Sequence, residues 1–347
     1  MRATLPLLVA LVGCRPTGSS TPPPPPNPFE TQPYASGPLA ATTKVFLVAG
    51  GDDVANFAAE VLEQRTLWRK AGLREDEIAC YYAKPTDEAW RRDRRQFEQL
   101  AVALRSCRAA SAEQLADDLA IAAQGAPDFV YLYVSSHGLP SQLRSLEASS
   151  RARTQRFVAS LDAHERAVLE PAAIGLEAKE PGLGEPRAIV RALRDHVVPE
   201  SLVFTPRTLA TMLAPFDPAV PTTIVLQACF SGGFIDHHAP GDPDPAPGSD
   251  ALLARPNLTV LTATATERPS FGCGSGQART YFGGAYNKAL ERALQAHEPT
   301  TLPWEDIHAQ VTFAVEAMEH VEGQRASLPG FVSQGATSDL DRPMTSP

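Results

Sequence analysis

Two short, strongly apolar stretches of this chain end in side chains that take part in catalysis in many enzymes. Residues 129–134 lead into Ser-Ser-His137-Gly138, and residues 222–228 lead into Cys229, which is followed by Phe-Ser-Gly-Gly. Runs of this length and composition are typical of strands buried on both faces of a parallel sheet. Because neighbouring parallel strands end at the same edge of a sheet, we expect His137 and Cys229 to lie together there.

A cysteine beside a histidine is the minimal set for nucleophilic catalysis by sulfur. The thiol is mostly protonated at neutral pH, and the imidazole either takes up its proton or protonates the leaving group. Glycine follows both residues and lets the backbone approach a substrate, so the amides of Gly138 and Cys229 are candidates for holding an oxyanion. The alternative is a buried strand-end thiol at Cys229 and a core histidine at His137. The presence of both at strand ends favours the catalytic interpretation.

The rest of the chain alternates between strand-like and helix-like patterns. Strands are expected at 45–49, 78–83, 129–134, 222–228 and 258–263, and helices at about 54–71, at 87–106, from Ser111 and from Pro303. This alternation predicts an α/β domain in which helices cover both faces of a mostly parallel sheet, with the site at the carboxyl ends of the strands. The Gly-Gly turn after the first strand has neither a GxGxxG motif nor a Walker lysine, which argues against a nucleotide site.

At these residues the sequence resembles a known group of enzymes. The His-Gly pair at 137–138 and the Gln-Ala-Cys triplet at 227–229 resemble the caspase-like cysteine peptidases. The stretch from Leu261 to Cys273 and the Thr-Tyr-Phe-Gly at 280–283 are similar to the segment that follows the catalytic cysteine in the legumain family. The first strand and its Gly-Gly turn, with Asn56 shortly after, also resemble legumain.

This resemblance covers about residues 44–321, apart from the segment between the two catalytic motifs. It implies a caspase-like three-layer sandwich and a cysteine endopeptidase that forms an acyl-enzyme on Cys229. It also implies that the side-chain amide of Asn56 orients His137, and that no cofactor is required. An acyl-enzyme resolved by an amine instead of water would make the protein a transpeptidase or transamidase.

The positions that set substrate choice depart from the legumain pattern. Legumain selects asparagine with an arginine, a glutamate and an aspartate, and the matching positions here are Ala58, Gln227 and Gly284. Thr262 and Ala263 are expected to line the same pocket. An amide side chain needs paired donors and acceptors, so the loss of all three charges argues against strict asparagine specificity. It also leaves a degenerate peptidase that only binds peptides as an alternative.

His137 and Cys229 are 92 positions apart, whereas roughly 50 separate the two residues in the caspase signature. We assign the extra residues to an insertion at about 139–203, which contains helix-like runs at 151–169 and 188–197. An insertion between the two catalytic strands emerges beside the cleft, so it is either a lid over the site or a surface decoration. The peptidase domain with this insertion is expected at 42–335.

The first residues have the features of an export signal. An apolar run too short to span a bilayer follows Met-Arg, and Leu-Val-Gly-Cys at 11–14 resembles the bacterial lipoprotein processing box. This resemblance implies a signal peptide at 1–14 that ends at a lipidated Cys14. Because Arg15 follows, it further implies an extracytoplasmic lipoprotein of the outer membrane of a Gram-negative bacterium. An ordinary cleaved signal and an uncleaved anchor are the alternatives.

Both ends of the chain are expected to lie outside the folded domain. Residues 15–41 are rich in Pro, Ser, Thr and Gly, with five consecutive prolines at 22–26. Such a segment cannot form a packed core and predicts a semi-rigid, extended tether. Residues 336–347 are expected to form a flexible tail.

Five cysteines are present. If Cys14 is lipidated and Cys229 remains a thiol, three others are left in an oxidising compartment. We expect Cys80 to pair with Cys107 and Cys273 to stay free. No C-x-x-C pair is present, so a structural zinc ion is not expected.

Charge limits the expected partners. A formal net charge of −9, without a basic stripe interleaved with aromatic residues, argues against nucleic acid. The expected partners are a peptide or protein substrate and, through Cys14, a membrane. His237 and His238 stand among acidic residues, but the surrounding prolines and glycines favour a solvated loop beside the cleft over the site of a metal-dependent hydrolase.

Overall fold

A seven-stranded sheet lies at the centre of the computed structural model, which describes residues 25–176, 186–236, 248–274 and 277–335. In spatial order its strands are β3 (Arg108–Ala109), β2 (Ile78–Tyr82), β1 (Val45–Ala49), β4 (Val130–Ser135), β7 (Thr222–Gln227), β8 (Leu258–Thr262) and β9 (Gly330–Ser333). All neighbouring strands run parallel except β8 and β9. Strands β1, β2, β4, β7 and β8 are buried along their whole length, which explains their continuous apolar sequences.

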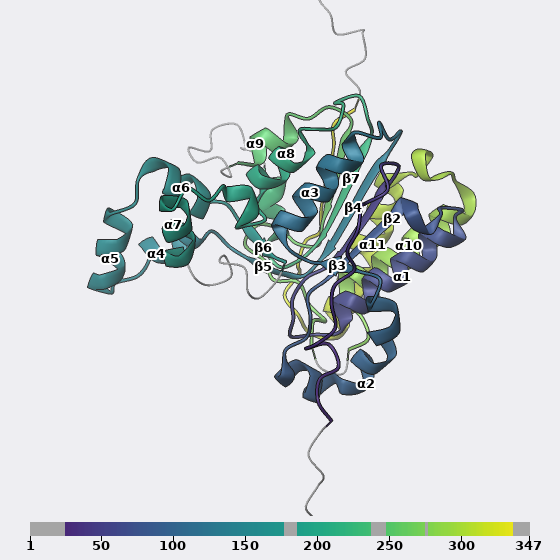
Figure 1. Cartoon of the computed structure of the whole chain (residues 1–347), viewed down its shortest axis with the longest axis horizontal. Coiled ribbons are helices and arrows are strands. Elements are labelled where there is room, and N and C mark those ends of the chain that lie inside the picture. Colours follow the sequence, from purple (N-terminus) through teal and green to yellow (C-terminus); the bar gives the residue numbers. More distant parts are fainter. Residues whose placement is uncertain (1–24, 177–185, 237–247, 275–276, 336–347) are drawn as a thin grey trace, which may run out of the picture.

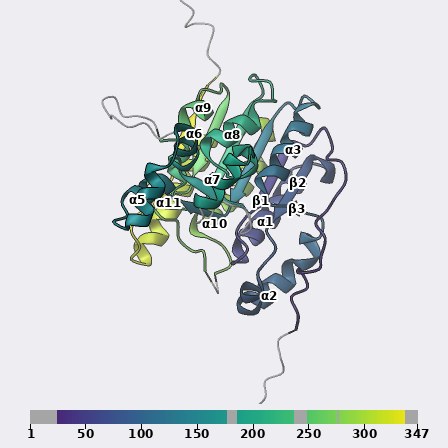
Figure 2. The same cartoon turned by 60° about the vertical axis from the view of Figure 1, so that its left-hand side comes forward.

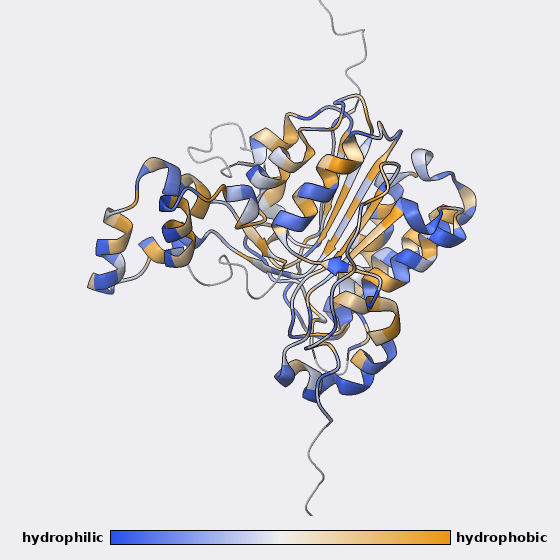
Figure 3. Ribbon diagram, viewed as in Figure 1, coloured by the Kyte–Doolittle hydropathy of each residue, from blue (hydrophilic) through white to orange (hydrophobic). Residues whose placement is uncertain are grey.

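Helices cover both faces of this sheet (Figure 1). One face packs against α1 (Asn56–Lys70), α2 (Asp87–Leu104), α10 (Tyr281–Ala296) and α11 (Trp304–Val321), and the other against α3 (Ala112–Ala123), α8 (Pro206–Leu213) and α9 (Ser249–Leu253). Side chains of β1 alternate between the two cores, with Leu47 on the first face and Phe46 and Val48 on the second. The predicted caspase-like three-layer α/β sandwich is confirmed, and Figure 3 shows hydrophobic strands beneath helices whose outer faces are hydrophilic.

Most expected elements are found with ends shifted by a few residues. Helix α1 begins at Asn56 because the preceding residues form a turn, and Ser111 caps α3 by accepting a hydrogen bond from the Gln114 amide. Strand β9 was not expected. Four short 3₁₀ helices complete the described chain: η1 (Glu75–Glu77), η2 (Pro199–Ser201), η3 (Ser231–Phe234) and η4 (Pro299–Thr301).

The segment assigned to an insertion forms a lobe with a small core of its own. It contains α4 (Gln142–Glu147), α5 (Ala152–Ala159), α6 (Ala163–Leu169) and α7 (Pro186–Arg194), which project to one side of the sheet (Figures 1 and 2). Leu143, Leu169 and Ile189 are among the residues of its core. The run expected as one helix at 151–169 is two helices, because Asp162 starts α6 with a capping box.

The lobe is attached directly to the segment that carries His137. Strand β5 (His137–Leu139) pairs antiparallel with β6 (Ala173–Gly175), which places His137 opposite Gly175. The lobe therefore returns to the edge of the sheet where β4 ends. The lobe is therefore positioned beside the sheet edge at which His137 lies.

The expectation of a free tether at 15–41 is wrong for its second half. Phe29 is completely buried, and its ring lies edge-on against Tyr82, Trp90 and Phe97 at centroid distances of 6.2, 5.9 and 6.0 Å. The Asn27 side chain donates to the Pro85 carbonyl at 2.9 Å. Proline-rich composition prevents helix and sheet formation, but one large aromatic side chain in an extended segment is enough to anchor it on a core.

The cysteine predictions are confirmed: Cys80 and Cys107 form a disulfide, and Cys229 and Cys273 are free. Cys14, the signal peptide at 1–14, the first half of the tether and the tail at 336–347 lie outside the described residues. Among the helices that the structure describes, none combines the length and hydrophobicity needed to cross a bilayer.

Candidate active site

The ends of β4 and β7 bring His137 and Cys229 to the same edge of the sheet. The two strands are parallel neighbours, with Ser135 opposite Gln227, and the histidine and the cysteine each follow two residues later. The Ser136 amide donates to the Gln227 carbonyl at 3.0 Å, so the ladder continues up to the site. The pairing of two central strands therefore positions both side chains.

Gly138 lies directly against the backbone of Cys229. A Cβ atom on this glycine would meet the Cys229 carbonyl oxygen at 1.8 Å and the Cys229 nitrogen at 3.1 Å. Any other residue would force the two segments apart, since real Cβ atoms do not approach so closely. The absence of a side chain at 138 is therefore what allows the histidine segment and the cysteine segment to pack together.

The imidazole of His137 is paired with a carboxylate that the sequence analysis did not select. Its Nε2 lies 2.6 Å from Oδ1 of Asp53, in the turn after β1, and the Phe57 ring packs edge-on at 5.1 Å. Burial of the Asp53 carboxyl opposes ionisation, but the hydrogen bond and the charges of His137 and Arg92 outweigh it. They lower the pKa of Asp53 below its ordinary value of 3.8.

Asn56 does not hold His137, contrary to what the legumain resemblance implies. Its Nδ2 donates to the Gly272 carbonyl at 2.8 Å, and its buried Oδ1 has no hydrogen-bond partner among the described residues. Asn56 lies in the first turn of α1 and faces the loop before α10. In this chain its contact therefore anchors that loop to α1.

The thiol of Cys229 contacts the backbone of Ser270. The Ser270 amide donates to Sγ at 3.2 Å, and the thiol faces the Ser270 carbonyl oxygen at 3.7 Å. Burial raises the pKa of the Cys229 thiol above its ordinary value of 9.0, although the hydrogen bond from Ser270 opposes this shift. Cys229 is therefore a neutral thiol at neutral pH and needs a base when it reacts.

This raised pKa predicts how alkylation of Cys229 depends on pH. Only the thiolate reacts, so the rate with iodoacetamide is expected to rise about tenfold per pH unit from pH 6 to 8, without a plateau. The measurement follows modification by intact mass in a Cys273→Ser variant of protein that begins after Cys14, which leaves Cys229 as the free thiol outside the disulfide. A plateau below pH 7 would reveal a preformed thiolate and contradict this expectation.

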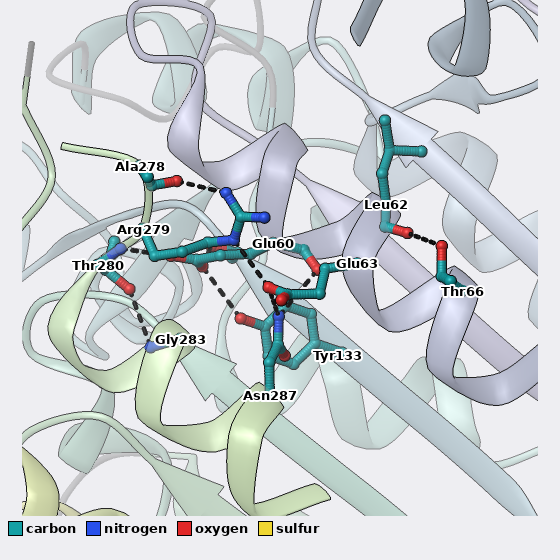
Figure 4. Close-up of polar contacts among 11 residues, drawn as sticks. Glu60, Leu62, Glu63, Thr66, Tyr133, Ala278, Arg279, Thr280, Gly283 and Asn287 are labelled. Atoms are coloured by element: carbon teal, nitrogen blue, oxygen red, sulfur yellow. Dashed lines mark hydrogen bonds and ion pairs between the residues drawn. The ribbon is translucent and has the colours of Figure 1, made fainter. Parts of the chain in front are cut away.

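A buried carboxyl, Glu60, connects three elements behind the site. It accepts hydrogen bonds from Ser135 Oγ at 2.6 Å, from the Thr280 amide at 2.6 Å and from Tyr133 Oη at 3.1 Å. Figure 4 shows this carboxyl between α1, β4 and the start of α10. Burial raises the pKa of Glu60, with the hydrogen bonds opposing the shift. A Cβ on Gly283 would meet the Glu60 carboxyl at 2.2 Å, so the glycine provides the space.

The position that corresponds to the legumain aspartate lies beside an ion pair. Gly284 packs near Arg279, whose Nε contacts Glu63 Oε2 at 2.7 Å, and Asn287 donates to the same Glu63 oxygen at 2.8 Å (Figure 4). Arg279 and Glu63 are partly exposed. Charged groups are therefore present next to this position, but they neutralise each other.

The residues expected to line the substrate pocket do not all face the same side of the sheet. Ala58 and Ala263 belong to the core on the α1 face, and Gln227 shares the strand face of Val225 in that core. Thr262 points to the opposite face, where it donates to the Thr264 carbonyl. Thr262 and Ala263 therefore lie on opposite sides of the sheet, because successive side chains of a strand alternate.

No cluster of three or more His, Cys, Asp or Glu suited to a metal ion occurs among the described residues. His237 and His238 lie outside those residues. Burial, with smaller contributions from the nearby Cys229, Asp53 and Glu60, raises the pKa of the Cys273 thiol. The reactive side chains described at this edge are therefore the free thiols of Cys229 and Cys273, the imidazole of His137 and the carboxyl of Asp53, with the buried carboxyl of Glu60 behind them.

Two polar residues on the buried face of α1, Glu60 and Gln64, were missed by the sequence analysis, which selected only Asn56 among the polar residues there. Asn56, Glu60 and Gln64 recur every four residues and are all buried. Their spacing is the signal that predicts a polar stripe facing the core. The sequence indicated Asp53 more weakly: it is an acidic residue in the turn after the first strand, and this turn lies at the sheet edge where the site was expected.

No family model and no curated protein matches the chain. Among solved structures, the protein GSU0716 from Geobacter sulfurreducens is similar, with a TM-score of 0.42 and 10% identity over 86% of this chain and 96% of that one. At this identity and TM-score the similarity does not bear on activity. The function therefore has to be argued from the geometry of the site.

Proposed function

We propose that this protein is a cysteine endopeptidase, as its resemblance to the legumain family implies. The observation that carries the proposal is the packing of the His137 segment against the Cys229 backbone at the adjoining ends of β4 and β7. A thiol and an imidazole at the carboxyl edge of a parallel sheet fit acyl transfer. The three charges of an asparagine pocket are absent, which also suits a protein that only binds peptides, and the experiment below separates the two.

In the proposed reaction the neutral thiol of Cys229 gives its proton to His137 while Sγ attacks the substrate carbonyl carbon. The amides of Gly138 and Cys229 hold the resulting oxyanion. The carbon–nitrogen bond breaks, the amine leaves with the proton from His137, and a thioester remains on Cys229. Water, deprotonated by His137, hydrolyses the thioester and restores the thiol.

The pocket chemistry supports a wider choice of substrate side chain than asparagine alone. Gln227 is buried, and its Oε1 has no hydrogen-bond partner among the described residues, so it can accept one hydrogen bond. Ala58 and Ala263 are apolar, and the Arg279–Glu63 pair beside Gly284 carries no net charge. We therefore propose a preference for neutral side chains, with hydrogen-bond donors tolerated.

We further propose that Cys14 is lipidated and holds the enzyme at a bacterial outer membrane, facing away from the cytoplasm. The Cys80–Cys107 disulfide supports an oxidising compartment. The segment around Phe29 packs on the domain, which shortens the length of chain available as a tether. A peptide or protein at the cell surface is then the expected substrate.

The proposal is tested by incubating protein that begins after Cys14 with a defined peptide pool and identifying new termini by mass spectrometry. We expect cleavage that iodoacetamide abolishes and that a metal chelator leaves unchanged. The same assay is run after limited proteolysis, which tests whether cutting the lobe next to the site admits substrate. Failure to cleave in both forms would overturn the peptidase proposal, and retained binding of the pool would favour the peptide-binding alternative.

A further inference from the structure

We infer that Asp53 is the residue that positions His137 for catalysis. In the legumain pattern this role belongs to the side-chain amide at the position of Asn56, whereas here a carboxylate performs it. This inference rests on the proposed function. Its central observation is the distance of 2.6 Å between Asp53 Oδ1 and His137 Nε2, while Asn56 is engaged with the Gly272 carbonyl. A distance this short is typical of a charge-assisted hydrogen bond.

The turn that carries Asp53 is fixed by contacts on several sides. The Gly50 amide donates to the Ser135 carbonyl at 2.9 Å, and the Gly51 amide donates to the Leu176 carbonyl at 3.3 Å. The Thr86 amide donates to the Asp52 carbonyl at 2.9 Å. These bonds tie the turn to β4, to the lobe and to the start of α2, so the carboxylate is held in place before any substrate binds.

Arg92 of α2 completes this support. Its guanidinium donates to the backbone carbonyl of Asp53 and, at 3.2 Å, to the Asp93 carboxylate. The charge of Arg92 also favours the ionised form of Asp53. The lowered pKa of Asp53 consequently keeps its carboxyl ionised at neutral pH.

The imidazole ring has little freedom at this position. Phe57 packs edge-on against it, and a Cβ on Gly51 would lie 3.1 Å from His137 Cδ2. The glycine therefore allows the turn to lie against the ring. With the ring confined on these sides, the bond to Asp53 decides which nitrogen carries the proton.

A carboxylate fixes the tautomer where an amide does not. It only accepts hydrogen bonds, so Nε2 must carry a proton, whereas an amide offers both a donor and an acceptor. Nδ1 is then the nitrogen with a free lone pair, and it receives the proton of the Cys229 thiol. The negative charge also stabilises the imidazolium formed at that moment, which matters because the Cys229 thiol starts neutral.

The inference is tested by NMR of protein labelled with ¹⁵N-histidine, a readout that needs no peptidase activity. We expect one ring N–H proton far downfield, and a His137→Gln variant assigns it among the eight histidines. Asp53→Asn is expected to remove this signal and to lower kcat on the order of 100-fold or more, with KM little changed. Asp128→Asn removes a highly exposed carboxylate and is expected to change neither readout.

Asp53 is half exposed, with 49% of its side chain accessible, so the asparagine variant is expected to fold. Asp53→Ser serves as a second variant and is expected to lose the same signal. If Asn56→Ala removes the downfield proton while Asp53→Asn keeps it, the inference is wrong and Asn56 is the positioning residue. If the signal depends on Asp53 but wild-type protein cleaves nothing, the pairing stands and the peptidase proposal fails.

Discussion

Replacement of Cys229 with alanine is expected to abolish peptide cleavage, with a loss on the order of 10⁴-fold or more in kcat/KM. The reason is chemical, since no acyl-enzyme forms without the sulfur, and general-base catalysis by His137 alone cannot replace it. The side chain lies just after a strand end, where its sulfur contacts the Ser270 backbone. Thermal unfolding of the variant is therefore expected to match the wild type closely.

The matched control is Cys273→Ser, which removes the other free thiol. This variant is expected to keep most of its activity, because Cys273 has no step in the proposed reaction. Rates are compared on the peptide that the wild type cleaves fastest. Equal activity in wild type and Cys229→Ala, or loss only in Cys273→Ser, would place the nucleophile elsewhere.

Replacement of Glu60 with alanine is expected to cost about 3–5 kcal/mol in the free energy of unfolding. The variant leaves the Tyr133 hydroxyl, the Ser135 hydroxyl and the Thr280 amide without their acceptor in the core, and each such group costs about 1–3 kcal/mol. Removal of the buried side chain also leaves a cavity between α1 and the sheet, which lowers the free energy of unfolding further. The measurement is urea unfolding followed by circular dichroism.

Glu63→Ala provides the comparison on the same helix. Its carboxylate is partly exposed and pairs with Arg279, so removing it is expected to cost about 1 kcal/mol or less. Glu60→Gln keeps the side-chain volume and one acceptor oxygen, and its loss is expected to fall between the two. A Glu60→Ala variant as stable as wild type would show that the three donors find other partners.

Local sequence patterns predicted the central strands and the place of Cys229 because both depend on burial. A strand that is buried on two faces must be apolar along its length, and a polar residue that follows it lies at the sheet edge. The runs before His137 and Cys229 satisfy this rule, and β4 and β7 are neighbours. The pairing of Cys80 with Cys107 was also predicted, and the structure confirms it.

Contacts between distant segments account for what the sequence did not predict. Asp53 was passed over because its role depends on the shape of a turn that is fixed by β4, the lobe and α2. Phe29 sits in a segment whose composition excludes regular structure, and nothing local indicates that its ring is buried. Thr262 was assigned to the pocket by resemblance, although the alternation of side chains along β8 separates it from Ala263.

The most direct test of Cys229 as the nucleophile is covalent trapping with a peptidyl chloromethyl ketone, read out by intact mass and peptide mapping. We expect one adduct per molecule, located on Cys229, formed much more slowly in His137→Ala and absent in Cys229→Ala. Cleavage of the peptide pool should stop in proportion to the adduct formed. An adduct on Cys273 instead, or continued cleavage after Cys229 is fully modified, would contradict the claim that Cys229 is the catalytic nucleophile.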